Sequence, residues 1–268
     1  MIPLREQEAI RSLFERELGG RVRIDFFTQR PLKLVLPGRE ECAFCEDVRK
    51  MLRELAGLSE RIVLTVHEFS EERAAAARLG VDRIPGIVVR GVLNRPLRFF
   101  GIPAANLFPA FVDTIIAASR AESTVSRETA RILKKMRRDV GLTVLVAPPC
   151  SHSAAMAFIA ARLALASPKV HASVVEVTEF PDLMERHEVR EVPTTIVDGR
   201  IALVGEVRFE EGLADALVEA SAEEPSPLAT TSRRHVGPAT PVGPPPRPPA
   251  EEAPSFRRTQ SGLILPGR

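Results

Sequence analysis

Two cysteines three positions apart are the residues of this chain whose spacing points most directly to chemistry. Cys42 and Cys45 precede a segment whose apolar side chains recur at steps of three and four, the spacing of one helix face. The pair therefore lies at the start of a predicted helix, where the positive end of the helix dipole favours the reactive thiolate of Cys42. Two cysteines one turn apart can also close a disulfide with little backbone movement. The spacing predicts thiol–disulfide exchange.

A second copy of the same pattern lies 108 residues further along the chain. Pro85 follows Cys42 by 43 residues, and Pro193 follows Cys150 by the same 43. The residues around the two prolines align without a gap, with 81–89 over 189–197, Ile84 over Val192 and, after a shift of four residues, Gly101 over Gly205. Two tandem copies of one domain explain this repeat.

The second copy has lost its second cysteine, because it has Ser153 where the first copy has Cys45. Cys150 is then either a monothiol that holds a mixed disulfide with glutathione or a protein, or the remnant of a site in a domain that became a scaffold. His152 lies between Cys150 and Ser153. As an imidazolium at a helix start it could lower the pKa of Cys150, or it could be a solvated loop residue.

Hydrophobic periodicity predicts the elements that must position these residues. Helices are expected at 4–18, 42–57, 71–79 and 105–119, and again at 126–138, 151–165, 181–187 and 213–220. Strands are expected at 22–27, 32–36, 62–66, 86–89 and 98–100, and again at 142–146, 172–177, 195–197 and 201–204. The strand at 32–36 would lead into Cys42, with the helix at 4–18 and the strand at 22–27 as additions. The pattern predicts an α/β chain of two tandem domains, each a mixed central sheet flanked by helices.

Length and composition limit the classes of function. The chain has 268 residues, enough for two domains, and 44% of them are apolar. The net charge of +2 does not indicate nucleic acid or an anionic membrane as a partner. Three cysteines, two of them in the CxxC motif, favour working thiols in a reducing compartment over a secreted disulfide framework. Without an apolar signal segment or a membrane-length apolar run, a cytoplasmic protein is expected.

The composition changes abruptly after Ala222. Residues 223–268 hold eleven of the 23 prolines and are expected to be a disordered tail. The predicted organisation is therefore a domain at 1–121 with the CxxC motif, a degenerate domain at 122–222, and the tail. The tail ends in an apolar patch formed by Leu263, Ile264 and Leu265, which could dock on a partner.

A strand ending in CxxC, followed downstream by Ile84-Pro85 or Val192-Pro193 before a hairpin, resembles the thioredoxin and glutaredoxin fold. Two copies joined through 98–104, with 144–150 before the second site, are similar to a narrower family. These are the tandem protein disulfide oxidoreductases of thermophilic archaea and bacteria, and the N-terminal part of alkyl hydroperoxide reductase flavoproteins. The resemblance spans residues 5–221. The chain departs from the family in lacking a CxxC motif in its second domain.

The resemblance implies a role for each residue of the motif. Cys42 would attack a substrate disulfide, and Cys45 would resolve the mixed disulfide. Pro85 would be a cis-proline against the sulfurs, with Ile84 pairing with a bound peptide, and Val192 and Pro193 would correspond to them. The alternative without a functional role is that Pro85 is a trans proline at the start of a strand. The family implies no bound cofactor, with protein disulfides as substrates and a thiol or flavoprotein as reductant.

Other interpretations compete at the motif. Four carboxylates flank it, which would oppose ionisation of Cys42, although the two that follow it could instead stabilise the first helical turn: Glu40, Glu41, Glu46 and Asp47. A zinc site would need four ligands, and no histidine has a matching spacing, so no metal is expected. His67, at the end of a predicted strand, is expected to be structural.

Two functions are therefore consistent with the sequence. One is a thiol–disulfide oxidoreductase that uses Cys42 and Cys45. The other is a weakly active or inactive scaffold, recruited to a larger assembly by the tail. The terminal peptide is weakly similar to the cargo-loading peptides of encapsulin shells, although its Leu-Pro-Gly-Arg end departs from their pattern.

Overall fold

The computed structural model describes residues 2–30, 42–121, 125–222 and 234–242, and the backbone of 256–258 and 264–266. The first half contains α1 (Leu4–Glu17), β1 (Val22–Thr28), α2 (Cys45–Ala56), β2 (Ile62–Glu68), α3 (Arg73–Leu79), β3 (Gly86–Arg90), β4 (Leu97–Phe100) and α4 (Leu107–Ala118). The second half contains α5 (Arg127–Leu133), β5 (Val140–Val146), α6 (Ser151–Ala166), β6 (Val170–Glu176), α7 (Pro181–Arg186), β7 (Glu191–Val192), β8 (Thr194–Val197), β9 (Arg200–Val204) and α8 (Glu210–Ala222). Four short strands follow: β10 (Arg234–His235), β11 (Thr240–Pro241), β12 (Phe256–Arg258) and β13 (Ile264–Pro266).

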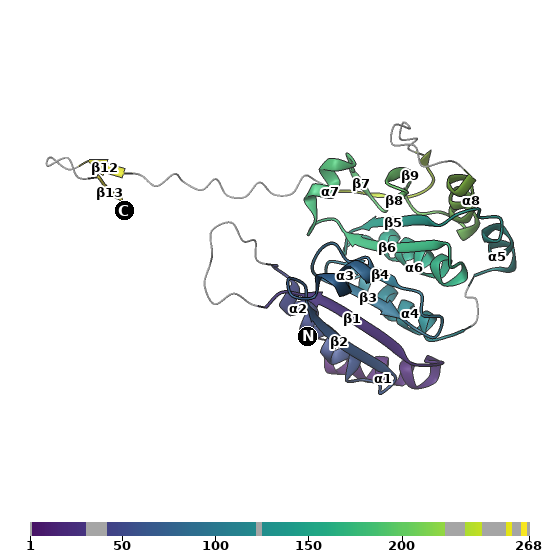
Figure 1. Ribbon diagram of the computed structural model, residues 1–268, viewed down its shortest axis with the longest axis horizontal. Helices are drawn as coiled ribbons and strands as arrows, with labels where there is room; N and C mark the ends of the chain where they lie inside the picture. The colour runs from purple at the N-terminus through teal and green to yellow at the C-terminus, as the bar shows by residue number, and fades with distance from the viewer. Residues whose placement is uncertain are drawn as a thin grey trace.

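One nine-stranded sheet runs through both halves, in the order β10-β9-β8-β5-β6-β4-β3-β1-β2 (Figure 1). Each half has the same internal arrangement, because β4-β3-β1-β2 repeats as β9-β8-β5-β6. In each, the first two strands are parallel and the last two join antiparallel. The halves meet where β4 pairs with β6 in parallel. The α/β class and the two tandem domains are confirmed.

The helices divide the apolar side chains between the two faces of the sheet. A large core cluster draws on α1, α2, α4, α5, α6 and α8, and a smaller cluster on the other face draws on α3 and α7. Alternation along β1 explains the division, because Ile24 and Phe26 join the large cluster whereas Phe27 joins the small one. Among the described helices, none is long and apolar enough to cross a bilayer.

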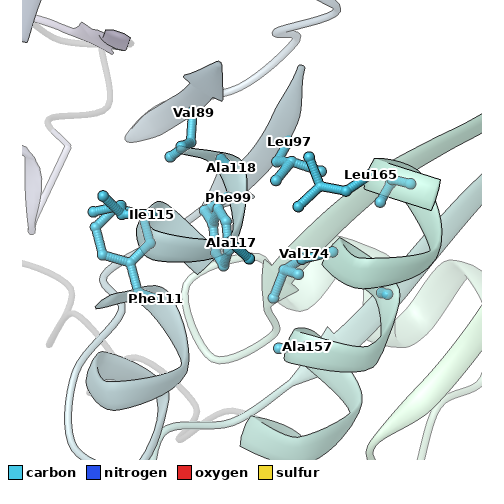
Figure 2. Packing of buried hydrophobic residues seen from close by; sticks show 14 of the residues in the cluster. Val89, Leu97, Phe99, Phe111, Ile115, Ala117, Ala118, Ala157, Leu165 and Val174 are labelled. Carbon is cyan, nitrogen blue, oxygen red and sulfur yellow. The ribbon is translucent and has the colours of Figure 1, made fainter. Parts of the chain in front are cut away.

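The large cluster is continuous across the junction of the halves. Figure 2 shows Phe99 of β4 beside Phe111 of α4, with Val174 of β6 and Ala157 of α6 on the other side of the junction. The rings of Phe99 and Phe111 meet edge to face, with centroids 5.0 Å apart. A shared apolar core and a shared sheet therefore hold the two halves together.

The repeat extends to single hydrogen bonds after each hairpin. The Gly101 amide donates to the Pro85 carbonyl at 3.0 Å, and the Gly205 amide donates to the Pro193 carbonyl at 2.8 Å. Both glycines have φ above +90°, a conformation that residues with a Cβ rarely adopt. The pairing of Gly101 with Gly205 inferred from the sequence is confirmed.

The strand that leads into the motif differs from the expectation. Residues 22–28 form β1, which takes the same place in the sheet as β5, so this strand belongs to the domain and is not an addition. Its apolar alternation satisfies both faces of a central strand. The expected strand at 32–36 lies outside the described residues. The helix expected at 126–138 ends at Leu133, because tighter backbone bonds from Lys135 to Ile132 and from Met136 to Leu133 close its last turn.

Part of the expected tail has a defined place. Within the segment predicted to be disordered, residues 234–242 pair with the second half through β10 and β11. Backbone pairing and apolar contacts offset the chain entropy there, which composition alone did not reveal. Residues 223–233 and 243–255 lie outside the described residues, as do 122–124. The boundaries at 121 and 222 therefore remain our proposal.

One hydrogen bond to a carboxylate links the two halves. Glu179, after β6, accepts a hydrogen bond of 2.6 Å from the Ile102 amide, after β4. Burial raises the pKa of Glu179 to about 7, and the charge of Glu176 adds to this, whereas the bond from Ile102 opposes it. Folding therefore favours the protonated carboxyl.

We predict that Glu179→Gln stabilises the protein more at high pH than at low pH. The folded carboxyl binds a proton up to about pH 7, whereas the unfolded one ionises near 4.5, so the wild type loses stability as pH rises between these values. Urea unfolding should show the benefit of the variant growing by about 1–2 kcal/mol from about pH 5 to about pH 8, after allowance for partial exposure. The exposed Glu185→Gln is the control for removal of a carboxylate, and equal trends in the two variants would contradict the prediction.

A second prediction concerns the shared core. Phe99 is only 5% exposed, so Phe99→Ala should leave a cavity and lower the free energy of unfolding by about 3–5 kcal/mol. Phe209 is 65% exposed, so Phe209→Ala is the matched control and should change stability by less than about 0.5 kcal/mol. Denaturant unfolding measures both. Similar losses in the two variants would show that the junction is not packed as described.

Candidate functional site

The two cysteines of the motif form a disulfide in this structure. Cys42 and Cys45 are joined with their Cα atoms 5.5 Å apart. Cys45 is buried at the first position of α2, whereas Cys42 lies before the helix, half-buried, with Ala43 and Phe44 exposed between them. The helix was expected to begin at Cys42, but the turn formed by Ala43 and Phe44 delays its start. Within the described residues, Cys42 is therefore the more exposed cysteine of the pair.

The charges beside the motif are arranged as helix-stabilising groups. Glu46 and Asp47 lie in the first turn of α2, and Glu46 pairs with Arg49 at 3.2 Å. A carboxylate in this position interacts favourably with the helix dipole, and its pairing with Arg49 balances its charge. Glu40 and Glu41 lie outside the described residues. The geometry therefore supports a structural role for the two carboxylates that follow the motif.

The two predicted cis-prolines have the expected conformation. The Ile84–Pro85 and Val192–Pro193 bonds are both cis. Pro85 is buried and Ile84 is half-buried against the smaller core cluster. In the second half the relation to the sulfur is explicit, because Cys150 Sγ lies 3.7 Å from the Val192 carbonyl oxygen. The second copy thus brings its cysteine and the residue before its cis-proline together.

Cys150 is a buried free thiol at the N-cap of α6. Burial alone would raise its pKa, but hydrogen bonds from the hydroxyls of Ser153 and Thr240 and from the backbone amides of Ser153 and His152 outweigh it, and the pKa is lowered. The serine that replaces the second cysteine therefore still interacts with the sulfur of Cys150. It supplies a hydrogen bond in place of a resolving thiol.

The side chain of His152 points elsewhere. Its Nδ1 lies 2.5 Å from a carboxylate oxygen of Glu206, and it acts on Cys150 through its backbone amide. The sequence leaves two interpretations of His152 open, an imidazolium that acts on the sulfur and a solvated loop residue; the structure instead places it on α6 with its side chain paired to Glu206. The spacing of the motif could not have revealed this, because Glu206 comes 54 residues later.

Thr240 is the site residue that sequence reasoning missed. Its hydroxyl donates to Cys150 Sγ at 3.1 Å from a position 90 residues away, in the segment expected to be disordered. Threonine and valine beside Pro241 were the one available signal, since β-branched residues and an edge proline suit a short edge strand. Nothing in the sequence predicts which strand this segment pairs with.

His67 is structural, as expected. Its Nε2 lies 2.9 Å from Asp25, its Nδ1 lies 2.7 Å from Glu72, and Arg90 binds the other oxygen of Asp25 at 2.6 Å. Burial lowers the pKa of His67, but the two carboxylates outweigh it and the pKa is raised. This network ties β1, β2 and β3 together. Across the described parts of the chain, no three His, Cys, Asp or Glu side chains are arranged as metal ligands.

Known proteins share this arrangement of helices and strands. A family model described as a thioredoxin domain matches residues 140–217, which run from β5 into α8. A protein disulfide oxidoreductase from Aeropyrum pernix superposes with a TM-score of 0.72 at 21% identity, over 83% of this chain and 94% of that one. The fold is that of tandem thioredoxin-like domains.

A second solved structure supports the same arrangement. The N-terminal N/C domain of the alkyl hydroperoxide reductase AhpF from Enterococcus faecalis superposes with a TM-score of 0.70 at 18% identity, over 81% of this chain and all of that one. Both likenesses establish the fold, including its tandem repeat. A search of the curated proteins finds no match to this sequence.

The terminal peptide remains a prediction. Leu263 lies outside the described residues, and the backbone of 264–266 forms β13, which pairs with β12. The expected docking of Leu263, Ile264 and Leu265 on a shell or scaffold protein is tested by nothing in this arrangement.

We predict that Thr240→Val raises the pKa of Cys150, because valine has a similar shape but no hydroxyl to stabilise the thiolate. In a Cys42→Ser, Cys45→Ser background, the pH dependence of thiolate ultraviolet absorbance reports Cys150 alone. The exposed Thr65→Val on β2 is the matched control and should leave the titration unchanged. An unchanged curve in Thr240→Val would mean that the hydroxyl does not act on the sulfur.

Proposed function

We propose that this protein is a thiol–disulfide oxidoreductase that reduces or exchanges protein disulfides through Cys42 and Cys45. The observation that carries the proposal is the disulfide at the start of α2, in which Cys45 is buried and Cys42 is partly exposed. A pair that closes reversibly can pass two electrons, and unequal access assigns the two sulfurs different roles. Cys42 is the attacking thiol and Cys45 the resolving thiol.

The reaction proceeds in two exchanges. In the reduced protein, the thiolate of Cys42 attacks one sulfur of a substrate disulfide, forms a mixed disulfide, and releases the other sulfur as a thiolate. Cys45, as its thiolate, then attacks the sulfur of Cys42, which releases the second substrate sulfur and leaves the Cys42–Cys45 disulfide. Two electrons pass from the dithiol to the substrate, and the two released thiolates take up protons from water.

The surface beside the disulfide suits an extended peptide. Phe44 is 40% exposed and offers an apolar contact, and the half-buried Ile84 precedes the cis-proline. In the second half, the corresponding Val192 pairs with an extended segment, Thr240 lying opposite it. We infer that a substrate strand pairs with Ile84 in the same way, since main-chain pairing accepts many sequences.

Regeneration needs an external reductant of the thiol or flavoprotein class. The similar solved structures are named as a protein disulfide oxidoreductase and as part of an alkyl hydroperoxide reductase, which supports either partner. We propose a cytoplasmic setting, where a free CxxC dithiol would be kept reduced. The proposal requires no bound cofactor.

We predict that Cys42→Ser abolishes reduction of a protein disulfide such as that of insulin, in an assay driven by a small dithiol. Cys150→Ser should retain activity within about twofold, because Cys150 is buried at the start of α6 and is not part of the Cys42–Cys45 pair. The rate of insulin precipitation measures both. Activity in Cys42→Ser, or a comparable loss in Cys150→Ser, would overturn the assignment of the chemistry to the first half.

Cys45→Ser gives a sharper version of the same test. Without a resolving thiol, the mixed disulfide on Cys42 should accumulate and be visible by non-reducing electrophoresis and mass spectrometry. The double variant Cys42→Ser, Cys45→Ser is the control and should trap no substrate. Trapping by that control would place the attacking thiol elsewhere.

A further inference from the structure

A segment of the C-terminal region lies across the second cysteine site. We call residues 234–242 the strap. Its β10 extends the edge of the sheet in parallel with β9, and its β11 pairs antiparallel with β7, which immediately precedes the cis-proline Pro193. Thr240 lies opposite Val192, the residue whose carbonyl oxygen is 3.7 Å from the sulfur of Cys150. The strap therefore runs along the strand that borders the thiol.

Backbone hydrogen bonds hold the strap at both ends and in the middle. The Val236 amide donates to Val204 at 3.0 Å, the Glu206 amide donates to the Pro238 carbonyl at 3.0 Å, and the Val242 amide donates to Arg190 at 2.9 Å. These bonds follow the main chain and do not depend on side-chain identity. This is the way in which an extended peptide binds to an exposed strand.

Three small apolar side chains of the strap are also partly buried. Val236 packs against the larger core cluster, and Ala239 and Val242 pack against the smaller one, which contains Cys150 itself. Between them the backbone of the strap lies very close to the domain. A Cβ atom added at Gly237 would lie 2.1 Å from the Glu206 carbonyl oxygen, so only glycine fits there.

The first half provides an internal comparison. Cys42 is half-buried with no strand of the described residues paired along Ile84, whereas Cys150 is 2% exposed beneath the strap. The hydroxyl of Thr240 reaches the sulfur of Cys150 at 3.1 Å. Within the described residues, a paired strand thus covers the second centre, and no strand is paired at the matching place in the first.

We propose that the edge of β7 beside Cys150 is a binding site for an extended peptide, and that the strap is its tethered occupant. The strap supplies a small hydroxyl residue opposite the sulfur and a glycine at the closest backbone approach. While it is bound, it shields the thiol. When it leaves, the thiol and the strand edge become available together to a peptide of another protein with the same small-residue pattern.

Tethering explains how a peptide of low intrinsic affinity can occupy this site. A ligand on the same chain has an effective concentration on the order of millimolar, so modest affinity suffices for occupancy. A competing peptide must then bind better or be present at a high local concentration. The proposal concerns Cys150 alone and does not depend on the activity proposed for Cys42 and Cys45.

The test measures the shielding of a single thiol. In a Cys42→Ser, Cys45→Ser background, Cys150 is the only thiol, because the chain has three cysteines. Its rate of alkylation by iodoacetamide is compared in the full chain, in a chain ending at Val242 that keeps the strap, and in a chain ending at Ala222 that lacks it. We expect the first two to react equally slowly and the third at least about tenfold faster. Equal rates in all three would overturn the proposal.

A point substitution tests the same idea in the full chain. Gly237→Ala should displace the strap and speed alkylation, whereas Gly212→Ala on α8, where an added Cβ meets nothing within 4 Å, should not. A synthetic peptide with the sequence of 234–242 should restore slow alkylation to the chain ending at Ala222, and a scrambled peptide should not. Faster alkylation that the peptide fails to reverse would mean general loosening of the second half, and would also overturn the proposal.

Discussion

The parallel pairing of β4 with β6 is the contact on which the rest of the molecule depends. It joins two four-stranded sheets into one, and the apolar side chains beside it, Phe99 and Val174 among them, belong to one continuous core. A shared sheet and a shared apolar core oppose independent movement of the two halves. Because each half has its own cysteine site at the start of α2 or α6, the junction places two centres in one continuous frame.

Within that frame, one substitution separates the chemistry of the two centres. In the first half, Cys45 gives Cys42 a partner with which to close a disulfide. In the second, Ser153 occupies the matching place and donates a hydrogen bond that helps lower the pKa of Cys150. A hydroxyl can stabilise a thiolate but cannot resolve a mixed disulfide. The second half therefore has a thiol of lowered pKa and no second cysteine at the matching position to resolve a mixed disulfide.

The strap covers the thiol of the second centre and also pairs with the outer edge of the sheet. An exposed edge strand invites pairing with other chains, and β10 covers the edge of β9. From there the strap continues to the cis-proline strand, so that one segment protects both the sheet and the thiol. On the opposite edge, β2 is stabilised from within by the network of His67, Asp25 and Glu72.

The sequence by itself determined the repeat, the fold class and the pair of cysteines that can form a disulfide. The equal spacing of Cys42 to Pro85 and of Cys150 to Pro193 survives in the structure as matching cis bonds and matching glycine hydrogen bonds, because these depend on local geometry. Tertiary structure alone decided the partners that are distant in sequence. Thr240 reaches Cys150 across 90 residues, and Glu206 takes the side chain of His152 across 54. Periodicity and spacing report which way a side chain faces along its own element, whereas these contacts arise only when separate elements pack together.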